Sequence, residues 1–370
     1  MRPSTSIVLA GGGTTGHLSP LVATAQALTA MGGVSLTCVG TAKGLETSVI
    51  PAAGLELVRI SADPLPRRLT LDLVKLPFRM LASMRQAGAV IDDAGARVVV
   101  GFGGYVSLPV YLAAWRRHLP IVMHEQNALP GLANKLMAPR AAAVLVSFPG
   151  TPLPKAQCVG LPVRAAVAAL ADGGRAEAQP EARARFGLPP TGPVLLVSGG
   201  SQGARSINTA VTQSRDALLN AGISILHVWG SANLPSDSAV MRGAQGASYV
   251  PLGYIEDMAQ AYAAADLMLA RAGAATVAET ATVGLPCLFV PFPHGNGEQV
   301  RNAQPLVRAG AAEVIMDADL TPEALLEAVT RLLGDSGHLA EMSAAAQSVM
   351  QPGAAQVVAK IVMSLAGGGS

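Results

Sequence analysis

The sequence predicts an α/β fold built from two Rossmann-like, parallel-sheet halves in tandem. Short Val- and Ile-rich runs without clear polar alternation recur along the chain, and longer helix-like segments separate them. Such runs are typical of parallel strands covered on both faces, and repeated β-α-β units form doubly wound sheets. The length of 370 residues also fits two domains better than one.

The first half opens with an apolar run at residues 6–10, which predicts a strand, and an Ala- and Leu-rich segment at 18–31, which predicts a helix. Further helices are expected near residues 45–53 and 71–93. The other strand-like runs of this half are rich in Val, Leu and Ile, and they lie at residues 34–40, 55–60, 97–104, 120–127 and 142–148.

The alternation stops between about residues 160 and 193, where Ala, Pro, Gly and charged residues predict a hinge followed by a surface helix. Strand-like runs then resume near residues 193–198, 223–230, 248–255, 267–273, 286–292 and 312–317. We therefore expect an N-terminal domain at 1–162, a C-terminal domain at 163–345, and a final helix within 346–370 that packs back on the N-terminal domain. A cleft between the two halves is the expected ligand site.

Composition excludes several classes of protein. The net charge of +2 argues against nucleic-acid binding through overall charge. Three cysteines without a C-x-x-C pair (Cys38, Cys158 and Cys287) predict core residues in a reducing compartment, and neither a disulfide framework nor a zinc site. Met1 lies just before the first strand and no uncharged apolar run of about 18 residues occurs, so neither a secretory signal nor a membrane span is expected.

Two glycine turns follow strands and raise competing hypotheses. "GGGTTG" at 11–16 fits the G-x-G-x-x-G pattern of nicotinamide-dinucleotide sites, but the first acidic residue after the second strand is Glu46, too late for the usual ribose contact. "GGSQG" at 199–203 fits the G-x-S-x-G elbow of α/β-hydrolases, with Asp266 and His294 as candidate partners of Ser201. However, an elbow belongs in the middle of one sheet, and Ser201 follows the first strand of the second half.

The histidines show no metal-ligand spacing, but His17 and His124 lie where strands end, which is the ligand-binding edge of an open α/β sheet. The stretch "PLPRRLTLDLVKLPFRMLASMR" at 64–85 interleaves basic and apolar residues. It is either an amphipathic segment that lies on an anionic membrane surface or an ordinary helix with its apolar face on the core.

With these residues in view, the chain resembles the MurG-type family of UDP-N-acetylglucosamine:undecaprenyl-diphospho-muramoyl-pentapeptide N-acetylglucosaminyltransferases. The resemblance covers nearly the whole chain, and its motifs occur in the family's order. They are "GGTTGHLSP", "GFGGYVSLP", "HEQNALPGLANK", "GLPVR", "GGSQGAR", "GYIEDM", "RAGAATVAE", "GLPCLFVPFP" and "EQVRNA". The resemblance implies the GT-B fold, two Rossmann-like domains that face each other across a cleft.

The resemblance also implies the binding residues. The donor, UDP-N-acetylglucosamine, would be bound by Thr14, Thr15, Gly16, Asn127, Arg164, Ser201, Ile255, Ala274, Ala275, Thr276, Glu279 and Gln299. Among these, Ile255 would meet the uracil, Glu279 the ribose and Gln299 the sugar. The lipid-linked acceptor, lipid I, would be bound by His17, Tyr105 and His124, and the membrane by Leu76, Phe78 and Arg79.

The reaction implied is an inverting, single displacement that gives lipid II, without a metal or other cofactor, on the cytoplasmic side of the cell membrane. A helix N-terminus can stabilise the leaving diphosphate. His17 is the candidate base because its unperturbed pKa suits proton transfer at neutral pH, and Glu125 is the alternative. The chain departs from the family pattern at Thr15 and Glu298. A nicotinamide-dependent oxidoreductase and a non-catalytic nucleotide-sugar binding protein are the alternative functions.

Overall fold

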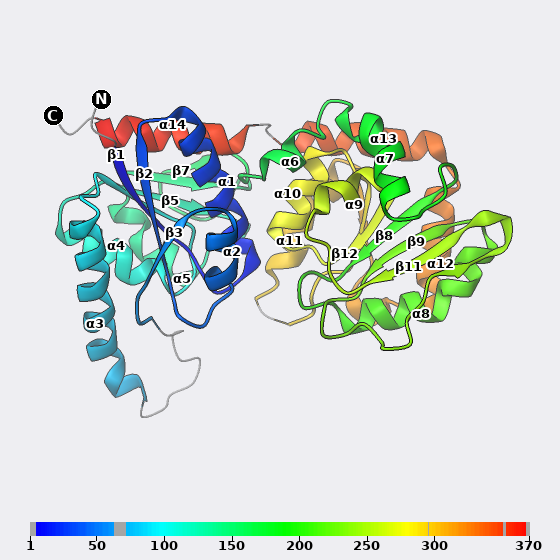
Figure 1. Ribbon diagram of the computed structural model, residues 1–370, viewed down its shortest axis with the longest axis horizontal. Coiled ribbons are helices and arrows are strands. Elements are labelled where there is room, and N and C mark those ends of the chain that lie inside the picture. Colours follow the sequence, from blue (N-terminus) through cyan, green and yellow to red (C-terminus); the bar gives the residue numbers. More distant parts are fainter. Residues whose placement is uncertain (1–4, 63–71, 295, 351–352, 368–370) are drawn as a thin grey trace. The chain divides into compact units, whose positions relative to one another are not determined.

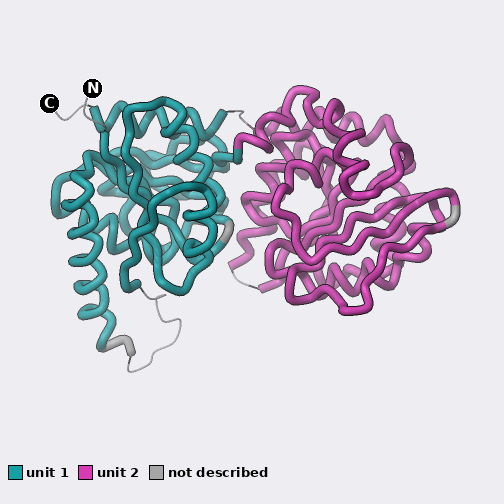
Figure 2. Tube along the Cα trace, in the orientation of Figure 1, with its two compact units in different colours: residues 1–164, 353–370 teal, residues 165–352 magenta. Residues whose placement is uncertain are grey.

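The computed structural model describes residues 5–62, 72–294, 296–350 and 353–367 (Figure 1). The chain forms two compact units, which are shown in different colours in Figure 2. Unit 1 comprises residues 1–164 together with 353–370, and unit 2 comprises residues 165–352. Each unit is built on its own seven-stranded sheet.

The sheet of unit 1 is parallel throughout, with the strand order β3-β2-β1-β4-β5-β6-β7. Its strands are β1 (Thr5–Ala10), β2 (Val34–Gly40), β3 (Glu56–Arg59), β4 (Val98–Gly101), β5 (Ile121–Glu125), β6 (Ala143–Val146) and β7 (Ala156–Cys158). The helices of this unit are α1 (Thr15–Met31), α2 (Glu46–Ala52), α3 (Asp72–Asp93), α4 (Ser107–Arg116), α5 (Leu132–Met137) and α14 (Ala354–Gly367), with a short 3-10 turn at Ala138–Arg140.

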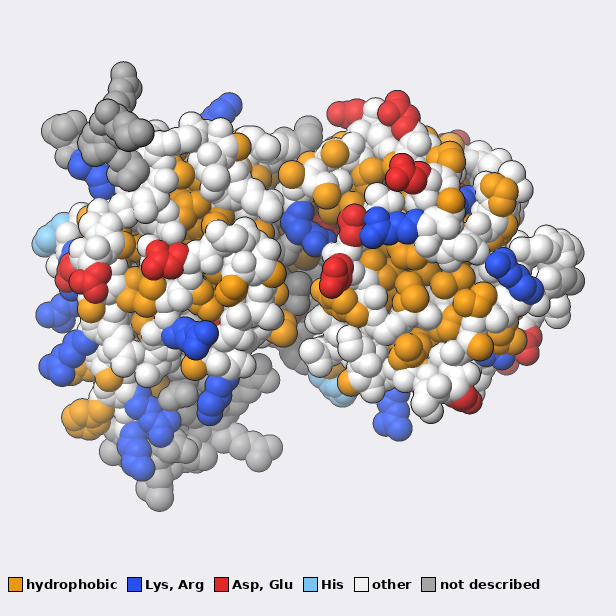
Figure 3. Space-filling model, viewed as in Figure 1, with side chains coloured by type: hydrophobic (Ala, Val, Ile, Leu, Met, Phe, Trp, Pro, Cys, Tyr) orange, Lys and Arg blue, Asp and Glu red, His pale blue; other side chains and the backbone are white. Residues whose placement is uncertain are grey.

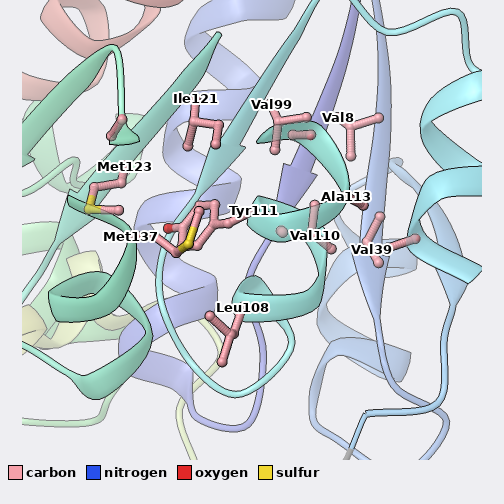
Figure 4. Packing of buried hydrophobic residues seen from close by; sticks show 14 of the residues in the cluster. Val8, Val39, Val99, Leu108, Val110, Tyr111, Ala113, Ile121, Met123 and Met137 are labelled. Atoms are coloured by element: carbon pink, nitrogen blue, oxygen red, sulfur yellow. The ribbon is translucent and has the colours of Figure 1, made fainter. Parts of the chain in front are cut away.

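Helices cover both faces of this sheet, which explains why its central strands lack polar alternation. On β1, Val8 and Ala10 belong to a core with α3 and α4, shown in Figure 4, while Ile7 and Leu9 belong to a second core with α1 and α14. All four side chains are fully buried. Alternate residues of one strand therefore supply both cores, as the pleat of a strand requires.

Helix α14 returns from unit 2 to complete unit 1. It packs along α1, and its residues Val358, Ala359 and Val362 are 0 % exposed. Val357 on the same helix is 37 % exposed, so α14 has one buried and one outer face. The final helix expected from the sequence is thus part of the second core of unit 1.

The sheet of unit 2 has the order β10-β11-β9-β8-β12-β13-β14, and only the short edge strand β10 runs antiparallel to its neighbour. Its strands are β8 (Val194–Ser198), β9 (Ser224–Val228), β10 (Met241–Arg242), β11 (Ser248–Leu252), β12 (Leu267–Ala270), β13 (Cys287–Phe289) and β14 (Ala312–Val314).

Helices of unit 2 follow most of its strands. They are α6 (Ala165–Ala168), α7 (Gly174–Arg185), α8 (Arg205–Asn220), α9 (Met258–Ala264), α10 (Ala274–Thr282), α11 (Glu298–Arg308), α12 (Pro322–Leu333) and α13 (Ser336–Val349), with 3-10 turns at Ala244–Gly246 and Asp317–Asp319. The sequence-predicted α/β class with two parallel-sheet halves is confirmed. Cys38, Cys158 and Cys287 are free cysteines, and Cys158 is only partly buried.

Residues 336–367 meet the length and composition criteria of a membrane-crossing helix, with a mean hydropathy of 1.2. This stretch contains α13 and α14, which belong to different units, and α14 buries one face in unit 1. The core helix of a globular protein meets the same criteria, so the stretch is weak evidence for a span. No other helix within the described ranges meets them.

We expect Val362→Asp to destabilise unit 1 by about 3–5 kcal/mol, because it would place an uncompensated charge in the core. Hydrogen exchange followed by mass spectrometry should then show faster exchange in peptides of unit 1 than in those of unit 2. Val357→Asp on the exposed face of the same helix is the matched control, and we expect it to change stability by less than about 0.5 kcal/mol. Equal effects of the two substitutions would contradict this account of α14.

Candidate functional site

The carboxyl edge of the unit 1 sheet carries the turns that hold most of the expected acceptor residues. Thr14 lies between β1 and α1, Gly16 and His17 lie in the first turn of α1, and Tyr105 lies between β4 and α4. The ring of Tyr105 packs over Gly13, where a Cβ atom would lie 3.1 Å from the Tyr105 Cε1 atom. The structure therefore brings these two turns together. The side chain of Thr15 lies outside the described part of the structure.

A buried carboxylate holds the β1–α1 turn in place. Glu46, at the start of α2, is 0 % exposed. Its Oε1 accepts hydrogen bonds from the Thr41 amide (2.9 Å) and hydroxyl (2.7 Å), and its Oε2 accepts one from the Gly13 amide (3.2 Å). Although burial alone would raise it, these hydrogen bonds leave the pKa of Glu46 below its ordinary value. Cβ atoms on Gly12, Gly40 or Gly44 would collide with the Glu46 side chain.

This contact argues against a dinucleotide site in the manner of nicotinamide enzymes. In such sites the amide groups of the glycine turn bind the pyrophosphate, and an acidic side chain binds the ribose. Here the Gly13 amide donates to Glu46, and the same carboxylate is occupied by Thr41. The first acidic residue after β2 is therefore a structural group within the protein.

His17 is partly buried beside the Gly103 turn, and its Nδ1 lies 3.0 Å from the Thr14 hydroxyl. Burial lowers the pKa of His17 below its usual value of about 6.5, and a main-chain contact with Gly12 and the charge of Glu46 oppose this shift only in part. The imidazole is therefore neutral at pH 7. A neutral, positioned imidazole is the form that can accept a proton.

Glu125, the alternative base, is 2 % exposed and serves the loop that follows β5. Its Oε1 accepts from the Asn127 amide (3.0 Å), and its Oε2 accepts from the Gly131 amide (2.9 Å) and the Asn134 side chain (2.8 Å). These bonds anchor the loop to the strand end. The geometry therefore favours a structural role for Glu125.

His124 is 0 % exposed, so it has no surface with which to touch an acceptor. Its Nε2 lies 2.9 Å from the carbonyl oxygen of Gly160, which can only accept, so Nε2 carries the proton. Burial lowers the pKa of His124 to about 4, which keeps the ring neutral. The expected acceptor contact at His124 thus has no geometric support, and the residue instead joins β5 to the Gly160 turn.

Asn127 and Arg164, which the resemblance assigned to the donor, lie in unit 1. Asn127 is half-buried in the loop that Glu125 anchors. The Nε of Arg164 is buried without a hydrogen-bond partner among the described residues. A polar atom of this kind is costly unless a ligand or solvent satisfies it.

Unit 2 contains a cavity of about 750 Å³ at the carboxyl edge of its sheet, within the size range of small-molecule sites. Side chains and turns after β8, β12, β13 and β14 line it. The lining residues are Gly199, Gly200, Gly203, Ala204, Arg205, Ser206, Thr209, Ala210, Gln213, Arg271, Gly273, Thr276, Phe292, Pro293, His294, Gln299, Asp317 and Leu320. Thr276 and Gln299 were both expected donor residues.

An ion pair that sequence reasoning missed lies in this cavity. Arg271 donates to Asp317 (2.5 Å), to Ser206 (2.9 Å) and to the carbonyl oxygens of Val290 and Pro291. Ser206 also donates to Asp317 (2.6 Å). Although burial alone would raise it, the Ser206 and Arg271 contacts hold the pKa of Asp317 below its usual range. The three side chains tie together the ends of β12, β13 and β14 and the start of α8.

Helix α10 begins beside this cavity with unfilled main-chain donors. Its N-cap is Gly273, and no side chain caps it. The amide groups of Ala274, Ala275 and Thr276 belong to the first turn, whose N–H groups have no partner within the helix. A helix start of this kind attracts anions such as a diphosphate. Nearby, Gln299 Oε1 accepts from the Phe292 amide (2.9 Å) and so holds the 292–299 loop.

The remaining expected donor residues differ in exposure. Ser201 is exposed in the glycine turn after β8. Ile255 and Glu279 are nearly buried, at 7 % and 6 % exposed, and Glu279 Oε2 accepts from the Tyr262 hydroxyl (2.7 Å). Neither Ile255 nor Glu279 lines the cavity. Glu279 lies one helical turn after Thr276, on the same helix.

The geometry excludes the hydrolase hypothesis for Ser201. Asp266 immediately precedes β12, at the amino edge of the sheet, whereas Ser201 follows β8 at the carboxyl edge. Asp266 instead forms an ion pair with Arg183 (2.8 Å) and accepts from the Val194 amide (2.8 Å). It cannot serve as the acid of a triad with Ser201 and His294.

Comparison with protein families and known proteins gives consistent matches. Residues 7–146 match the glycosyltransferase family 28 N-terminal domain, and residues 194–358 match the family 28 C-terminal domain. The UDP-N-acetylglucosamine–N-acetylmuramyl-(pentapeptide) pyrophosphoryl-undecaprenol N-acetylglucosamine transferase of Cutibacterium acnes is 54 % identical over 364 residues, covering 98 % of this chain and 97 % of that protein. The protein of the same name from Mycobacterium tuberculosis is 48 % identical, covering 99 % and 90 %.

Solved structures agree with these matches. The crystal structure of Acinetobacter baumannii MurG is similar with a TM-score of 0.74 at 28 % identity, covering 98 % of this chain and 100 % of that chain. The calicheamicin glycosyltransferase CalG4 has a TM-score of 0.67 at 18 % identity and covers the full length of both chains, which shows a shared fold alone.

We expect Glu46→Gln to lower the free energy of unfolding by about 2 kcal/mol at pH 7, because an amide cannot accept all three hydrogen bonds. The depressed pKa of Glu46 makes its contribution fully present above the unfolded-state value of about 4.3 and lost as the pH falls through the folded-state value. Urea unfolding at several pH values should therefore show the difference between wild type and variant shrinking toward pH 3. Glu56→Gln, at an exposed position of strand β3, is the control. A difference independent of pH would contradict this role.

Proposed function

This chain belongs to glycosyltransferase family 28, and we propose that it transfers N-acetylglucosamine from UDP-N-acetylglucosamine to lipid I, giving lipid II for peptidoglycan synthesis. It is a glycosyltransferase with the GT-B fold, as the sequence predicts. The acceptor, in the printed name of its relatives, is an N-acetylmuramyl-(pentapeptide) pyrophosphoryl-undecaprenol.

The unit 2 cavity is the observation that carries this proposal. The segments "GGSQGAR", "RAGAATVAE" and "EQVRNA", which are far apart in the sequence, contribute adjacent parts of its wall. We propose that the uncapped start of α10 at 274–276, together with Ser201, binds the diphosphate of the donor, and that Gln299 contacts its sugar. Arg205 lines the same cavity and has no ion-pair partner among the described residues, so it can add a positive charge there. Glu279 would bind the ribose and Ile255 the uracil.

We propose that unit 1 supplies the acceptor site and the base. The 4-hydroxyl oxygen of the muramoyl sugar forms a bond to the anomeric carbon of N-acetylglucosamine, the bond from that carbon to UDP breaks, and the hydroxyl proton passes to His17. The Thr14 hydroxyl, 3.0 Å from His17 Nδ1, fixes the ring orientation. Charge developing on the UDP is stabilised by the donors at the start of α10. Tyr105 lies beside this turn, and we propose that it contacts the acceptor.

We propose that α3 places the protein on an anionic membrane surface. Phe78 is 74 % exposed and Leu81 is 41 % exposed, while Lys75, Arg79 and Arg85 on the same helix are also exposed. In Figure 3, Lys and Arg side chains gather at the end of unit 1 that carries α3, beside exposed hydrophobic side chains. Leu76 is half-buried, and Arg67 and Arg68 lie outside the described residues. A basic helix with exposed apolar residues binds such surfaces.

The function is tested by acceptor-dependent release of UDP from UDP-N-acetylglucosamine. We expect wild type to release UDP only with the lipid acceptor, and His17→Ala to lower kcat by about 10²- to 10⁴-fold while UDP-N-acetylglucosamine still binds. His118→Asn, at an exposed position of unit 1, is the control. Donor binding without any release by wild type would favour the non-catalytic alternative. Undiminished kcat in His17→Ala would assign the base to another residue.

The pH profile gives a second test of His17. Because burial lowers its pKa, the base form is present above a midpoint that lies below about 6.5. We expect kcat/KM to rise with pH through that midpoint and then to level off, because kcat/KM reports the ionisation of the free enzyme. Loss of this acidic limb in His17→Ala would support the assignment, and an unchanged limb would contradict it.

Membrane association is tested by sedimentation with vesicles that contain anionic lipid. We expect Phe78→Ser to weaken binding by about ten-fold or more, because a buried aromatic ring contributes about 1.5–3 kcal/mol, and we expect added salt to weaken wild-type binding. Val240→Ser, at a 56 % exposed position of unit 2, is the matched control. Equal binding of wild type and Phe78→Ser would overturn the membrane role of α3.

A further inference from the structure

A closed set of hydrogen bonds lies behind the unit 2 cavity, and none of the motif residues assigned above belongs to it. It joins Asn208 of α8, His227 of β9, Tyr249 of β11 and Trp229, which follows β9. Asn208, His227 and Tyr249 are 4 %, 0 % and 4 % exposed. The rings of His227 and Trp229 stack with their centroids 4.6 Å apart.

The direction of each hydrogen bond follows from the chemistry of the groups. The Trp229 indole can only donate, and it donates to the Tyr249 hydroxyl (3.0 Å). The Asn208 amide nitrogen donates to the Trp229 carbonyl oxygen (3.1 Å), which leaves Asn208 Oδ1 as an acceptor for His227 Nε2 (3.2 Å). His227 Nδ1 then accepts from the Tyr249 hydroxyl (3.2 Å).

The circuit therefore begins at the Trp229 side chain and ends at the Trp229 main chain, and it uses one proton at each link. It requires a neutral His227, because a second ring proton would oppose the Tyr249 hydroxyl. Burial lowers the pKa of His227 to about 3, which keeps the ring neutral at physiological pH. We name these four hydrogen-bonded side chains the Trp229 network.

The Trp229 network supports the glycine turn that lines the cavity. Gly203 has φ = 73°, and a Cβ atom there would collide with the Trp229 carbonyl oxygen. A Cβ atom on Gly230 would lie 2.6 Å from the Gly203 amide nitrogen, so the two turns are in direct contact. Asn233 adds a hydrogen bond to the Gln202 carbonyl oxygen (2.7 Å). On its other side, the turn presents Gly199, Gly200 and Gly203 to the cavity.

We propose that Asn208, His227, Trp229 and Tyr249 are positioning residues for the nucleotide-sugar donor. They hold the 229–230 turn, the 199–203 turn rests on it, and the wall of the donor cavity keeps the shape that accepts the ligand. The inference rests on the proposed function of unit 2. None of the four residues needs to touch the donor.

Tyr249→Phe is the primary test, because it removes one hydroxyl and two hydrogen bonds of the Trp229 network with little change in volume. We expect UDP-N-acetylglucosamine to bind about ten-fold more weakly by calorimetry, since the Trp229 indole N–H and His227 Nδ1 both lose their partner. KM for the donor should rise by a similar factor, and kcat at saturating donor should stay within about two-fold of wild type. Asn208→Asp is a second variant, because it keeps the acceptor for His227 but cannot donate to the Trp229 carbonyl.

Ser214→Ala is the matched control. Ser214 is buried on the same helix as Asn208 but does not line the cavity, and its hydroxyl donates to the carbonyl oxygens of Ala210 and Pro322. We expect it to lower the melting temperature without changing donor KM. Weakened binding in Tyr249→Phe and Asn208→Asp but not in Ser214→Ala supports the proposal. Wild-type affinity in both Tyr249→Phe and Asn208→Asp, or an equal rise in KM in Ser214→Ala, overturns it.

The same calorimetry separates this inference from the proposed function. If wild type does not bind UDP-N-acetylglucosamine, the donor assignment of unit 2 fails and the inference fails with it. If wild type binds the donor and the two variants of the Trp229 network bind it equally well, only the inference fails.

Discussion

The hydrogen bonds that buried carboxylates accept from turn amides are the constraint on which the unit 1 site depends. Glu46 takes the amides of Gly13 and Thr41, and Glu125 takes those of Asn127 and Gly131. Charge-assisted bonds of this kind are short and strong in a buried setting. They fix the turns that carry Thr14 and Asn127, and they occupy donors that a pyrophosphate would otherwise use. In unit 2 the start of α10 has no side-chain cap, so the amides of its first turn are open to an anion.

The fold could be predicted from the sequence, as could the glycine turns at the carboxyl edges of the two sheets, because strand ends and glycine turns have clear local signals. The short strands β7 and β10 were missed, since runs of two or three half-exposed residues carry no periodicity. Side-chain direction was the larger difficulty. His124 and Glu125 end one strand and both were expected at the site, yet the structure buries both. The partners of Arg271 and Glu46 were also hidden. Arg271 pairs with Asp317, which follows a different strand, and Glu46 accepts from main-chain amides, which leave no pattern in the sequence.

Each unit holds a glycine turn at a strand end in a fixed conformation, and the two units do so in different ways. A glycine turn at a strand end has few side-chain contacts of its own, so something behind it must hold its shape. Unit 1 uses the carboxylate of Glu46, which reaches the Gly13 amide directly. Unit 2 uses the uncharged Trp229 network, which acts through the second turn at Gly230. In each case the supporting groups are fully satisfied, which is what makes a buried polar network stabilising.

The return of α14 to unit 1 also affects the order in which the chain can fold during translation. All of residues 165–352 leave the ribosome before 354–367, so the second half of the protein is complete while the first still lacks a helix. At typical elongation rates this delay is on the order of tens of seconds. Throughout it, the face of the first sheet that carries Ile7 and Leu9 lacks part of its cover. The nascent chain therefore exposes an apolar surface that chaperones can bind and that favours aggregation.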